Sequence, residues 1–324
     1  MHSGPGGVPG LRPRLKQGTW IFDPAPVPQD PILPPDVLPI RNNGENTRLP
    51  PYVRRLKALL PGALSQTLRA AYYPCFRTML AIRCWYADVR HPPSVAPPAG
   101  MPIPPALLRY RVSESTDPGL FLAVGEQTSQ NIQAALLRAD RRIADCQSIL
   151  DFGCGCGRTL LWLTQQFPDA RFCGADVDAE AIAWCRAHLP VADWRVNAAL
   201  PPLAFPDNEF DLIYGISVFT HLPADWQQRW LPELARILRP GGILLLTVHG
   251  ERAWRQLDPA AQQRLRREGF LFETSTKLRG ILPEWYHTAY HTHEYAVSQV
   301  GAHLRVLAYV AGGMGDQDVI IAQR

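Results

Sequence analysis

The clearest chemical pattern in the sequence is a glycine-rich segment, DFGCGCGR (151–158), between a short apolar run and a helical stretch. Glycine lets the backbone turn tightly and approach a ligand closely. In open α/β sheets, ligands bind where such turns leave the carboxyl ends of the strands. A dinucleotide-binding fingerprint would end in glycine at the position of Arg158. The segment therefore favours a ligand with a small zwitterionic tail, and Arg158 is predicted to begin the helix as an exposed charge.

Two carboxylates follow the next apolar run, in GADVD (174–178). Asp176 lies 25 residues after Asp151. A carboxylate at the end of the second strand of a nucleotide-binding sheet can accept hydrogen bonds from ribose hydroxyls. Asp178 lies further from the strand and is predicted to cap the following helix. We therefore assign a ribose to Asp176.

Three histidines are candidates for a general base, because imidazole titrates near neutral pH. His221, His249 and His291 all follow apolar runs whose ends are expected at one edge of the sheet. His249 comes directly after LLLTV, so its side chain is expected at that edge. His221 also has a structural interpretation, as a hydrogen-bonded scaffold residue in a turn. HTHE (291–294) lacks a third ligand at fixed spacing, so no metal site is expected.

An aromatic segment, PEWYHTAYH (283–291), is expected to cover a pocket for a planar or sugar-like small molecule. Its candidate contacts are Trp285, Tyr286 and Tyr290. Tyr110 and Arg111 are expected to close the other side. Aromatic side chains most often serve packing, so this segment could instead cover the edge of the sheet.

Alternating apolar runs and helical stretches must position these residues. The runs have the length of buried strands and are SILDF (148–152), RFCGA (171–175), DWRVN (193–197), FDLIYGI (210–216) and GGILLLTV (241–248). The helical stretches are RTLLWLTQQF (158–167), DAEAIAWCRAHL (178–189) and PADWQQRWLPELARIL (223–238). Such alternation predicts an α/β fold with a doubly wound, mostly parallel sheet. HLRVLAYV (303–310) and DVIIAQR (318–324) flank a glycine-rich turn and predict a closing antiparallel hairpin.

The front of the chain differs from this body in composition. Residues 1–111 carry 14 Lys+Arg against 5 Asp+Glu, whereas residues 112–324 carry 19 against 24. Residues 1–51 contain twelve prolines and are predicted to be a disordered tail. Residues 52–110 are predicted to be a helical extension and linker, and residues 111–324 the main domain. The arginines of this region are dispersed, and two interpretations of their charge stay open. They form either a solvated surface or a surface that binds an anionic partner or a membrane.

Cysteine content and hydropathy bear on the compartment. The seven cysteines are scattered with no CxxC pair, which indicates reduced thiols in a cytoplasmic protein. No apolar run approaches the roughly 20 residues of a membrane span, and the first residues lack the apolar core of a secretory signal.

With these motifs in order, residues from about 118 to 324 resemble class I S-adenosylmethionine-dependent methyltransferases. The pieces that carry the resemblance are ILDFGCGCGRT, FCGADVDAEAIAWCR, FPDNEFDLIYGISVFTHL and ILRPGGILLLT. The resemblance implies a seven-stranded sheet and a cofactor site. The residues of this cofactor site would be Asp151, Gly153, Cys154 and Gly155 at the methionine, Asp176 at the ribose, Val177 and Asn197 at the adenine, and Ile216 and Ser217 after the fourth strand.

The resemblance implies methylation of a small-molecule acceptor at oxygen or nitrogen. RYRVSESTDPGLFLAVG and WYHTAYHTHEY also resemble small bacterial methyltransferases of glycan or natural-product pathways. Methylation of RNA or protein is an alternative, although no basic patch interleaved with aromatics indicates nucleic acid. A non-catalytic module that binds S-adenosylmethionine is a further alternative. Nicotinamide-dependent oxidoreduction is disfavoured by Arg158.

Overall fold

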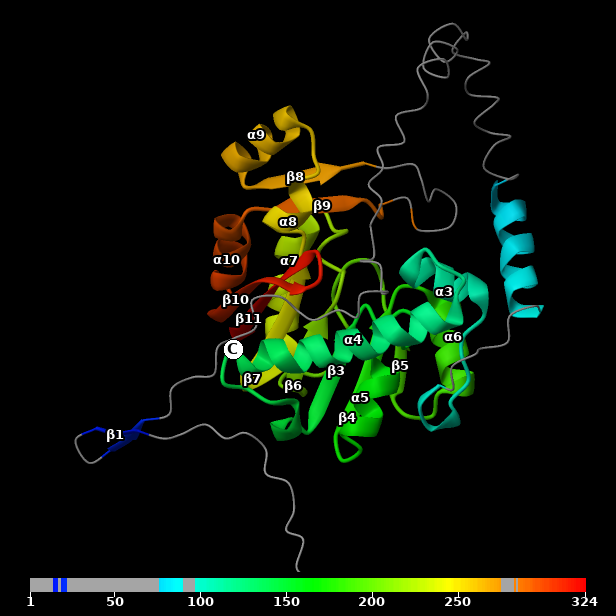
Figure 1. Cartoon of the computed structure of the whole chain (residues 1–324), viewed down its shortest axis with the longest axis horizontal. Helices are drawn as coiled ribbons and strands as arrows, with labels where there is room; N and C mark the ends of the chain where they lie inside the picture. The colour runs from blue at the N-terminus through cyan, green and yellow to red at the C-terminus, as the bar shows by residue number, and fades with distance from the viewer. Residues whose placement is uncertain (1–13, 17–18, 22–75, 90–96, 275–282, 284) are drawn as a thin grey trace, which may run out of the picture. The chain divides into compact units, whose positions relative to one another are not determined.

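The computed structural model describes residues 14–16, 19–21, 76–89, 97–274, 283 and 285–324. The chain divides into two units, residues 1–58 and 59–324. In the first unit, the described residues form an antiparallel pair, β1 (Arg14–Lys16) and β2 (Thr19–Ile21), which the sequence had not predicted (Figure 1). The rest of the predicted tail lies outside the described residues.

The second unit is built on a seven-stranded sheet in the order β10-β11-β7-β6-β3-β4-β5. In chain order, the strands are β3 (Ser148–Phe152), β4 (Arg171–Asp176), β5 (Asp193–Val196), β6 (Phe210–Gly215), β7 (Leu238–Val248), β10 (Arg305–Met314) and β11 (Gln317–Gln323). β11 is antiparallel to both β7 and β10, and the other pairs are parallel. The predicted fold class, with its closing antiparallel hairpin, is confirmed.

The strand order reverses between β3 and β6. The chain passes from β3 to β4 and β5 on one side, and later enters β6 on the other. The loops that leave β3 and β6 therefore diverge, which opens a crevice at the carboxyl ends of these strands. β3 is buried at every position, so its final residue holds the glycine loop at a fixed place.

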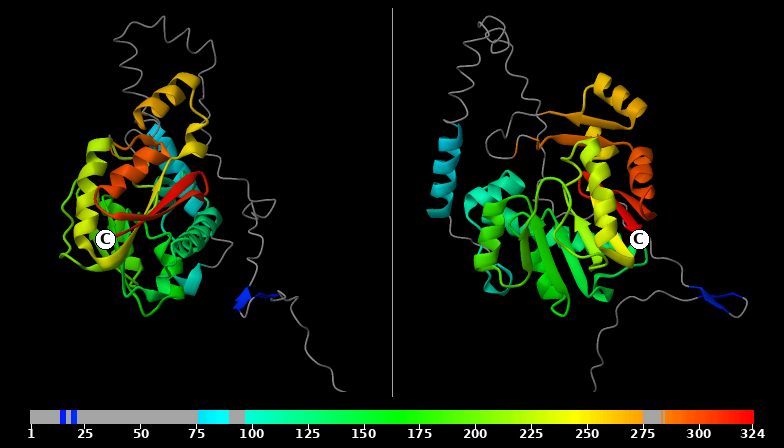
Figure 2. Two further views of the ribbon diagram at one scale, coloured as in Figure 1. Left: turned by 90° about the vertical axis from the view of Figure 1, so that its left-hand side faces the viewer. Right: turned by 180° about the vertical axis from the view of Figure 1, so that it is seen from behind.

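Helices cover both faces of this sheet (Figure 2). α4 (Pro118–Leu137), α5 (Leu160–Gln166) and α6 (Ala179–His188) contribute to one apolar cluster, and α7 (Ala224–Ile237) and α10 (His293–Gly301) contribute to the other. Successive strand residues point to opposite faces, and accordingly Ile149 belongs to the first cluster and Leu150 to the second. Asp178 caps α6 as predicted, since its carboxylate accepts from the N–H groups of Glu180 and Ala181.

A smaller sheet accompanies the main one, and the sequence had not predicted it. β8 (Phe270–Glu273) pairs antiparallel with β9 (Thr288–His291). α8 (Glu251–Trp254) and α9 (Pro259–Glu268) precede it along the chain (Figure 1). β9 approaches the end of β7, where the N–H of His291 donates to the carbonyl of His249 over 2.9 Å. The aromatic segment is thereby tied to the carboxyl edge of the main sheet.

Before the sheet, the chain forms a helix over residues 76–89, followed by the 3-10 turn η1 (Pro98–Gly100) and α3 (Ala106–Ser113). Another 3-10 turn, η2 (Ile143–Asp145), leads into β3. The predicted domain boundary at residues 110 and 111 falls inside α3, and the division of the whole chain stays a prediction. No helix in the part of the chain that the structure describes has the length and apolar character of a membrane span.

Candidate functional site

A cavity of about 560 Å³ lies at the carboxyl ends of β3, β4 and β6. The positions expected from the sequence to hold a nucleoside cofactor all line it. These residues are Asp151, Gly153, Cys154, Gly155, Asp176, Val177, Asn197, Ile216 and Ser217. Segments far apart in the sequence meet here, because the ends of parallel strands share one edge of the sheet.

Gly153 and Gly155 allow the conformation of the glycine loop. A larger residue at either position would require the neighbouring atoms to shift. Gly153 has a φ of +81°, and a Cβ added there would lie 2.3 Å from Val218 Cγ2. Gly155 has a φ of +54°, and its added Cβ would lie 2.6 Å from Val112 Cγ1. Both the left-handed backbone and the close approach exclude larger residues. Cys154 and Cys156 between these glycines are buried, and burial raises the pKa of the Cys156 thiol to about 12.

Asp176 is fixed by the backbone of two loops. Its carboxylate accepts from the N–H of Gly155 over 2.7 Å and from the N–H of Asp178 over 2.8 Å. Burial raises the pKa of Asp176, and these N–H groups oppose the rise. Each oxygen can still accept a further hydrogen bond. The arrangement is therefore suited to two neighbouring hydroxyl donors.

Asp151 is a buried carboxyl at the end of β3, with 4% of its surface exposed. Burial is the main cause that raises its pKa to about 8, and the nearby Asp176 charge adds to the rise. The Tyr214 hydroxyl on the adjacent strand opposes it. A cationic ligand would favour the ionised form of this group.

Asn197 and Ser217 lie after the ends of β5 and β6 and also line the cavity. Asn197 Nδ2 donates to the Ala198 carbonyl over 2.8 Å, but Asn197 Oδ1 is buried with no partner among the described residues. Such an orphaned acceptor fits an amino group on a ligand. Ser217 has a φ of +58°, a left-handed conformation held by a 2.7 Å hydrogen bond from its N–H to Thr247 Oγ1. Backbone strain of this kind is concentrated at functional sites.

Of the three candidate bases, only His221 lines the cavity among the residues described there. Its Nδ1–H donates to the His287 carbonyl over 2.7 Å, so its Nε2 carries the lone pair. Its ring stacks on Tyr286 with centroids 3.9 Å apart. Burial is the main cause that lowers the pKa of His221 to about 3, which keeps the imidazole neutral.

His249 and His291 do not line this cavity. Both are buried side chains that join β7, β9 and α7 by hydrogen bonds. His249 Nδ1 donates to the Ala289 carbonyl over 3.1 Å, and His291 Nε2 donates to Gln227 Oε1 over 3.0 Å. Burial lowers the pKa of both, that of His291 to about 3. The structure thus gives these two histidines positions inside the scaffold.

The family comparison agrees with this geometry. Residues 149–242, which hold the glycine loop, Asp176, Asn197 and Ser217, match the family model described as "Methyltransferase domain". This part of the chain is a methyltransferase domain.

Curated relatives resemble the methyltransferase domain and its surroundings. A trans-aconitate 2-methyltransferase from Azoarcus sp. is 38% identical over 104 residues, which are 32% of this chain and 40% of that protein. A fatty-acid O-methyltransferase from Mycolicibacterium smegmatis is 30% identical over 43% of this chain and 51% of its own length. A tRNA N(3)-methylcytidine methyltransferase from Drosophila melanogaster is 33% identical over 36% of this chain and 39% of its own length. The chain therefore spans about half or less of these relatives.

Only some of the residues expected to contact an acceptor line the cavity of about 560 Å³. Trp285 and Tyr286 line the cavity. Tyr290 instead lies in β9 opposite Leu271, and Tyr110 packs against the apolar cluster of the helix over residues 76–89. Arg111 does line the cavity, but beside the nucleoside end, where it forms ion pairs of 3.0 Å with Asp178 and 2.7 Å with Glu180.

Sequence reasoning missed Arg158 as a member of the site. The prediction of an exposed charge at the start of a helix was wrong: Arg158 is half-buried, lines the cavity and donates to the Val112 carbonyl over 3.2 Å. It is covered because α3 and α4 pack over the glycine loop, with Gly125 of α4 directly against Arg158. Gly125, a glycine inside the apolar pattern of α4, is the sequence feature that could have indicated this close contact.

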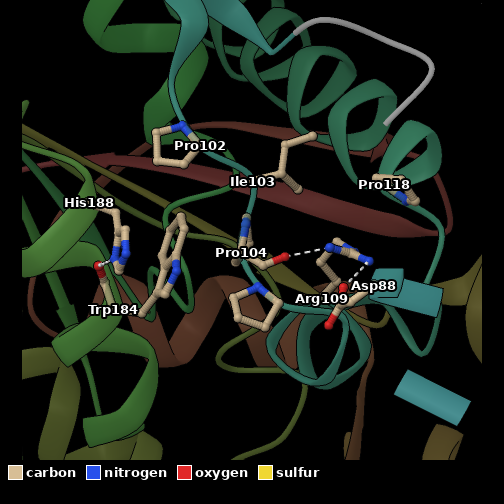
Figure 3. A pocket seen from close by; sticks show the side chains of 9 residues that line it. Asp88, Pro102, Ile103, Pro104, Arg109, Pro118, Trp184 and His188 are labelled. Carbon is tan, nitrogen blue, oxygen red and sulfur yellow. Dashed lines mark hydrogen bonds and ion pairs between the residues drawn. The ribbon is translucent and has the colours of Figure 1, made fainter. Parts of the chain in front are cut away.

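A second cavity, of about 520 Å³, lies outside the methyltransferase site (Figure 3). It is bordered by the proline-rich segment over residues 102–105, by Arg109 of α3, and by Trp184 and His188 of α6. The two aromatic rings stack with centroids 5.0 Å apart. Arg109 faces the cavity but is bound to the Pro104 and Thr116 carbonyls and to Asp88. Among the residues described by the structure, no group of three His, Cys, Asp or Glu could hold a metal ion.

Proposed function

We propose that the protein transfers a methyl group from S-adenosylmethionine to a small-molecule acceptor. The observation that carries this proposal is the order of polar groups along one cavity: Asn197 Oδ1, the Asp176 carboxylate and the Asp151 carboxyl. These groups suit, in turn, an adenine amino group, ribose hydroxyls and an ammonium group. The sulfonium of the cofactor supplies an electrophilic methyl group when it is bound.

In this proposal, His221 takes the proton of the acceptor. Its Nδ1–H donates to the His287 carbonyl, and no hydrogen bond joins Nε2 to a residue that the structure describes, so Nε2 can accept a proton at the cavity. The stacked Tyr286 ring fixes the orientation of the imidazole. A hydroxyl becomes strongly acidic as its oxygen gains the methyl group, so an imidazole of lowered pKa can still take the proton at that stage. Alignment and exclusion of water supply the rest of the catalysis.

The acceptor itself would lie against Trp285 and Tyr286. Both side chains line the cavity, and Trp285 packs on Trp226 with centroids 5.2 Å apart. Such walls suit a planar or sugar-linked molecule, as in natural-product pathways. Two of the relatives act, by name, on small carboxylic acids, which supports a small molecule as the acceptor class.

Isothermal titration calorimetry tests the cofactor. We expect S-adenosylhomocysteine to bind and NAD not to bind, since Arg158 occupies the position where the dinucleotide-binding fingerprint has its last glycine. Binding of NAD alone would reject the proposal. A screen of metabolites for uptake of the labelled methyl group would then identify the acceptor.

A second candidate is methylation of RNA, which the similarity to the Drosophila tRNA methyltransferase and the basic charge of residues 1–111 favour. Binding to RNA that weakens steeply with salt would support it. A module that binds the cofactor without catalysis predicts cofactor binding and no transfer to either acceptor. We also propose a cytoplasmic location, because the cysteines that the structure describes are free thiols.

A further inference from the structure

The helix over residues 76–89, cyan in Figure 1, is apolar on two sides. On its inner face, Leu80, Cys84 and Ala87 form a buried cluster with the start of α3. Its outer face carries large apolar side chains, each with 50–67% of its surface exposed. They are spaced three or four residues apart and therefore share one side of the helix. These residues are Met79, Ile82, Trp85, Tyr86 and Val89.

This outer face gathers most of the exposed large apolar side chains of the described residues. The others are Leu137 and Val196, which lie singly on distant elements. Isolated exposed apolar residues are normal on a protein surface, whereas a contiguous group of them marks an interaction site. A helix that is apolar all round is usually covered on every side. The outer face therefore requires an apolar occupant.

The charged side chains of the helix define the sign of that occupant. Arg77 and Arg83 are exposed, and neither forms an ion pair with a residue that the structure describes. The one carboxylate of the helix, on Asp88, pairs with Arg109 over 3.1 Å and accepts from the N–H of Ala106. Residues 1–111 as a whole carry 14 Lys+Arg against 5 Asp+Glu. The surroundings of the outer face are thus positive and complement an anionic surface.

We propose that the outer face of residues 76–89 binds the surface of an anionic lipid bilayer. The helix lies in the plane of the interface, with Ile82 and Trp85 at the boundary of the acyl chains. Tryptophan and tyrosine favour this boundary, because their rings are apolar with a polar edge. Arginine side chains at the flanks of a helix can extend to the lipid phosphates while their stems cover apolar surface.

A second copy of the chain fits the outer face less well. A stable dimer engages about 20–30 residues on each side, whereas this face offers five large apolar side chains on one helix. A two-fold contact would also bring the Arg77 and Arg83 of both copies together. The helix has no free carboxylate to pair with them, since Asp88 is bound to Arg109. Lipid phosphates supply the missing negative charge.

Co-sedimentation of the full chain with lipid vesicles tests the proposal. We expect binding to vesicles of equal parts phosphatidylglycerol and phosphatidylcholine, much weaker binding to phosphatidylcholine alone, and release as the salt concentration rises. The double substitution Ile82→Gln and Trp85→Gln should lower the partition coefficient by about 10- to 100-fold, and Arg83→Gln by about 5-fold. Leu137→Gln and Arg142→Gln are the matched controls, because these exposed side chains lie elsewhere, and they should change nothing. All of these substitutions leave the inner face of the helix intact.

Three results with vesicles would overturn the proposal. One is a wild-type protein that does not bind the anionic vesicles. Another is equal binding to anionic and neutral vesicles, which would exclude a role for the arginines. The third is binding that survives the double substitution, which would place the lipid site on another part of the chain. Sedimentation velocity without lipid tests the second copy: a dimer that the double substitution converts to a monomer would assign the outer face to self-association instead.

Discussion

Two arginines, each withdrawn from solvent beside a cavity, show how a structural cation differs from one available to a ligand. Arg109 is 4% exposed, and carbonyls of Pro104 and Thr116 and the carboxylate of Asp88 occupy its donors. Among the residues that the structure describes, Arg158 makes one hydrogen bond, to the Val112 carbonyl. Burial alone therefore does not identify a functional charge. Donors that remain open at a cavity do, because a ligand can complete them.

The same contrast separates the histidines, and it gives the largest expected effect. His221 presents a free Nε2 to the cavity, whereas His249 and His291 are tied to the scaffold. We expect His221→Gln to lower kcat by about 100- to 10,000-fold with little change in affinity for the cofactor. His249→Gln is the matched control, and steady-state kinetics with the identified acceptor is the measurement. A larger loss in His249→Gln than in His221→Gln would reverse the assignment.

Arg109→Met tests whether Arg109 stabilises the fold. It removes the ion pair with Asp88, which keeps its hydrogen bond from the Ala106 N–H, and it removes the donors to two backbone carbonyls. The free energy of unfolding should therefore fall by about 2–4 kcal/mol. Arg158→Met removes one hydrogen bond and should change that free energy by less than about 1 kcal/mol. Urea unfolding measures both. Equal losses would show that the two arginines have the same role.

Asp151→Asn tests whether the carboxyl at the cavity is maintained at a cost in stability. The folded pKa is about 8, whereas the ordinary value is 3.8, so the folded state retains a proton that the unfolded state releases. Stability from this group is therefore fully present below about pH 4 and declines as the pH rises towards 8. The variant should remove this decline and be more stable at pH 8, on the order of a few kcal/mol. Thermal unfolding between pH 5 and 8 checks it, with the exposed Asp145→Asn as control.

Asp176→Ala should lower the affinity for S-adenosylhomocysteine by about 1.5–3 kcal/mol. The variant removes the proposed hydrogen bonds to the ribose. Methylthioadenosine, which carries this ribose without the amino-acid end of the cofactor, should therefore lose the same amount. Calorimetry with both ligands makes the comparison. Unchanged affinity would remove Asp176 from the ribose site.

The sequence predicted the sheet well because each strand is a short apolar run bounded by turn residues. β3 has the predicted bounds, and β7 begins at Leu238, three residues before the predicted start. Positions at the strand ends, such as Asp151 and Asp176, follow from this topology. The sequence does not predict that His221 lines the cavity and His249 does not, because this difference depends on how β8 and β9 pack against the main sheet. Periodicity within a segment carries no information on packing between segments so distant in sequence.

The burial of Arg158 also depends on packing between distant segments. Its place after the last glycine predicted the first residue of a helix, but α5 begins at Leu160. The environment of Arg158 is set by α3 and α4, which come earlier in the chain. Tyr110 was misplaced for a related reason. One turn of α3 directs Val112 towards the glycine loop and Tyr110 towards the helix over residues 76–89.

The sulfur atoms in the glycine loop have a consequence for handling the protein. Cys154 and Cys156 are buried, and burial holds both as neutral thiols at physiological pH. Alkylating reagents and peroxides attack the thiolate, so they should spare this turn. Strict anaerobic purification is then unnecessary for the integrity of the nucleoside pocket.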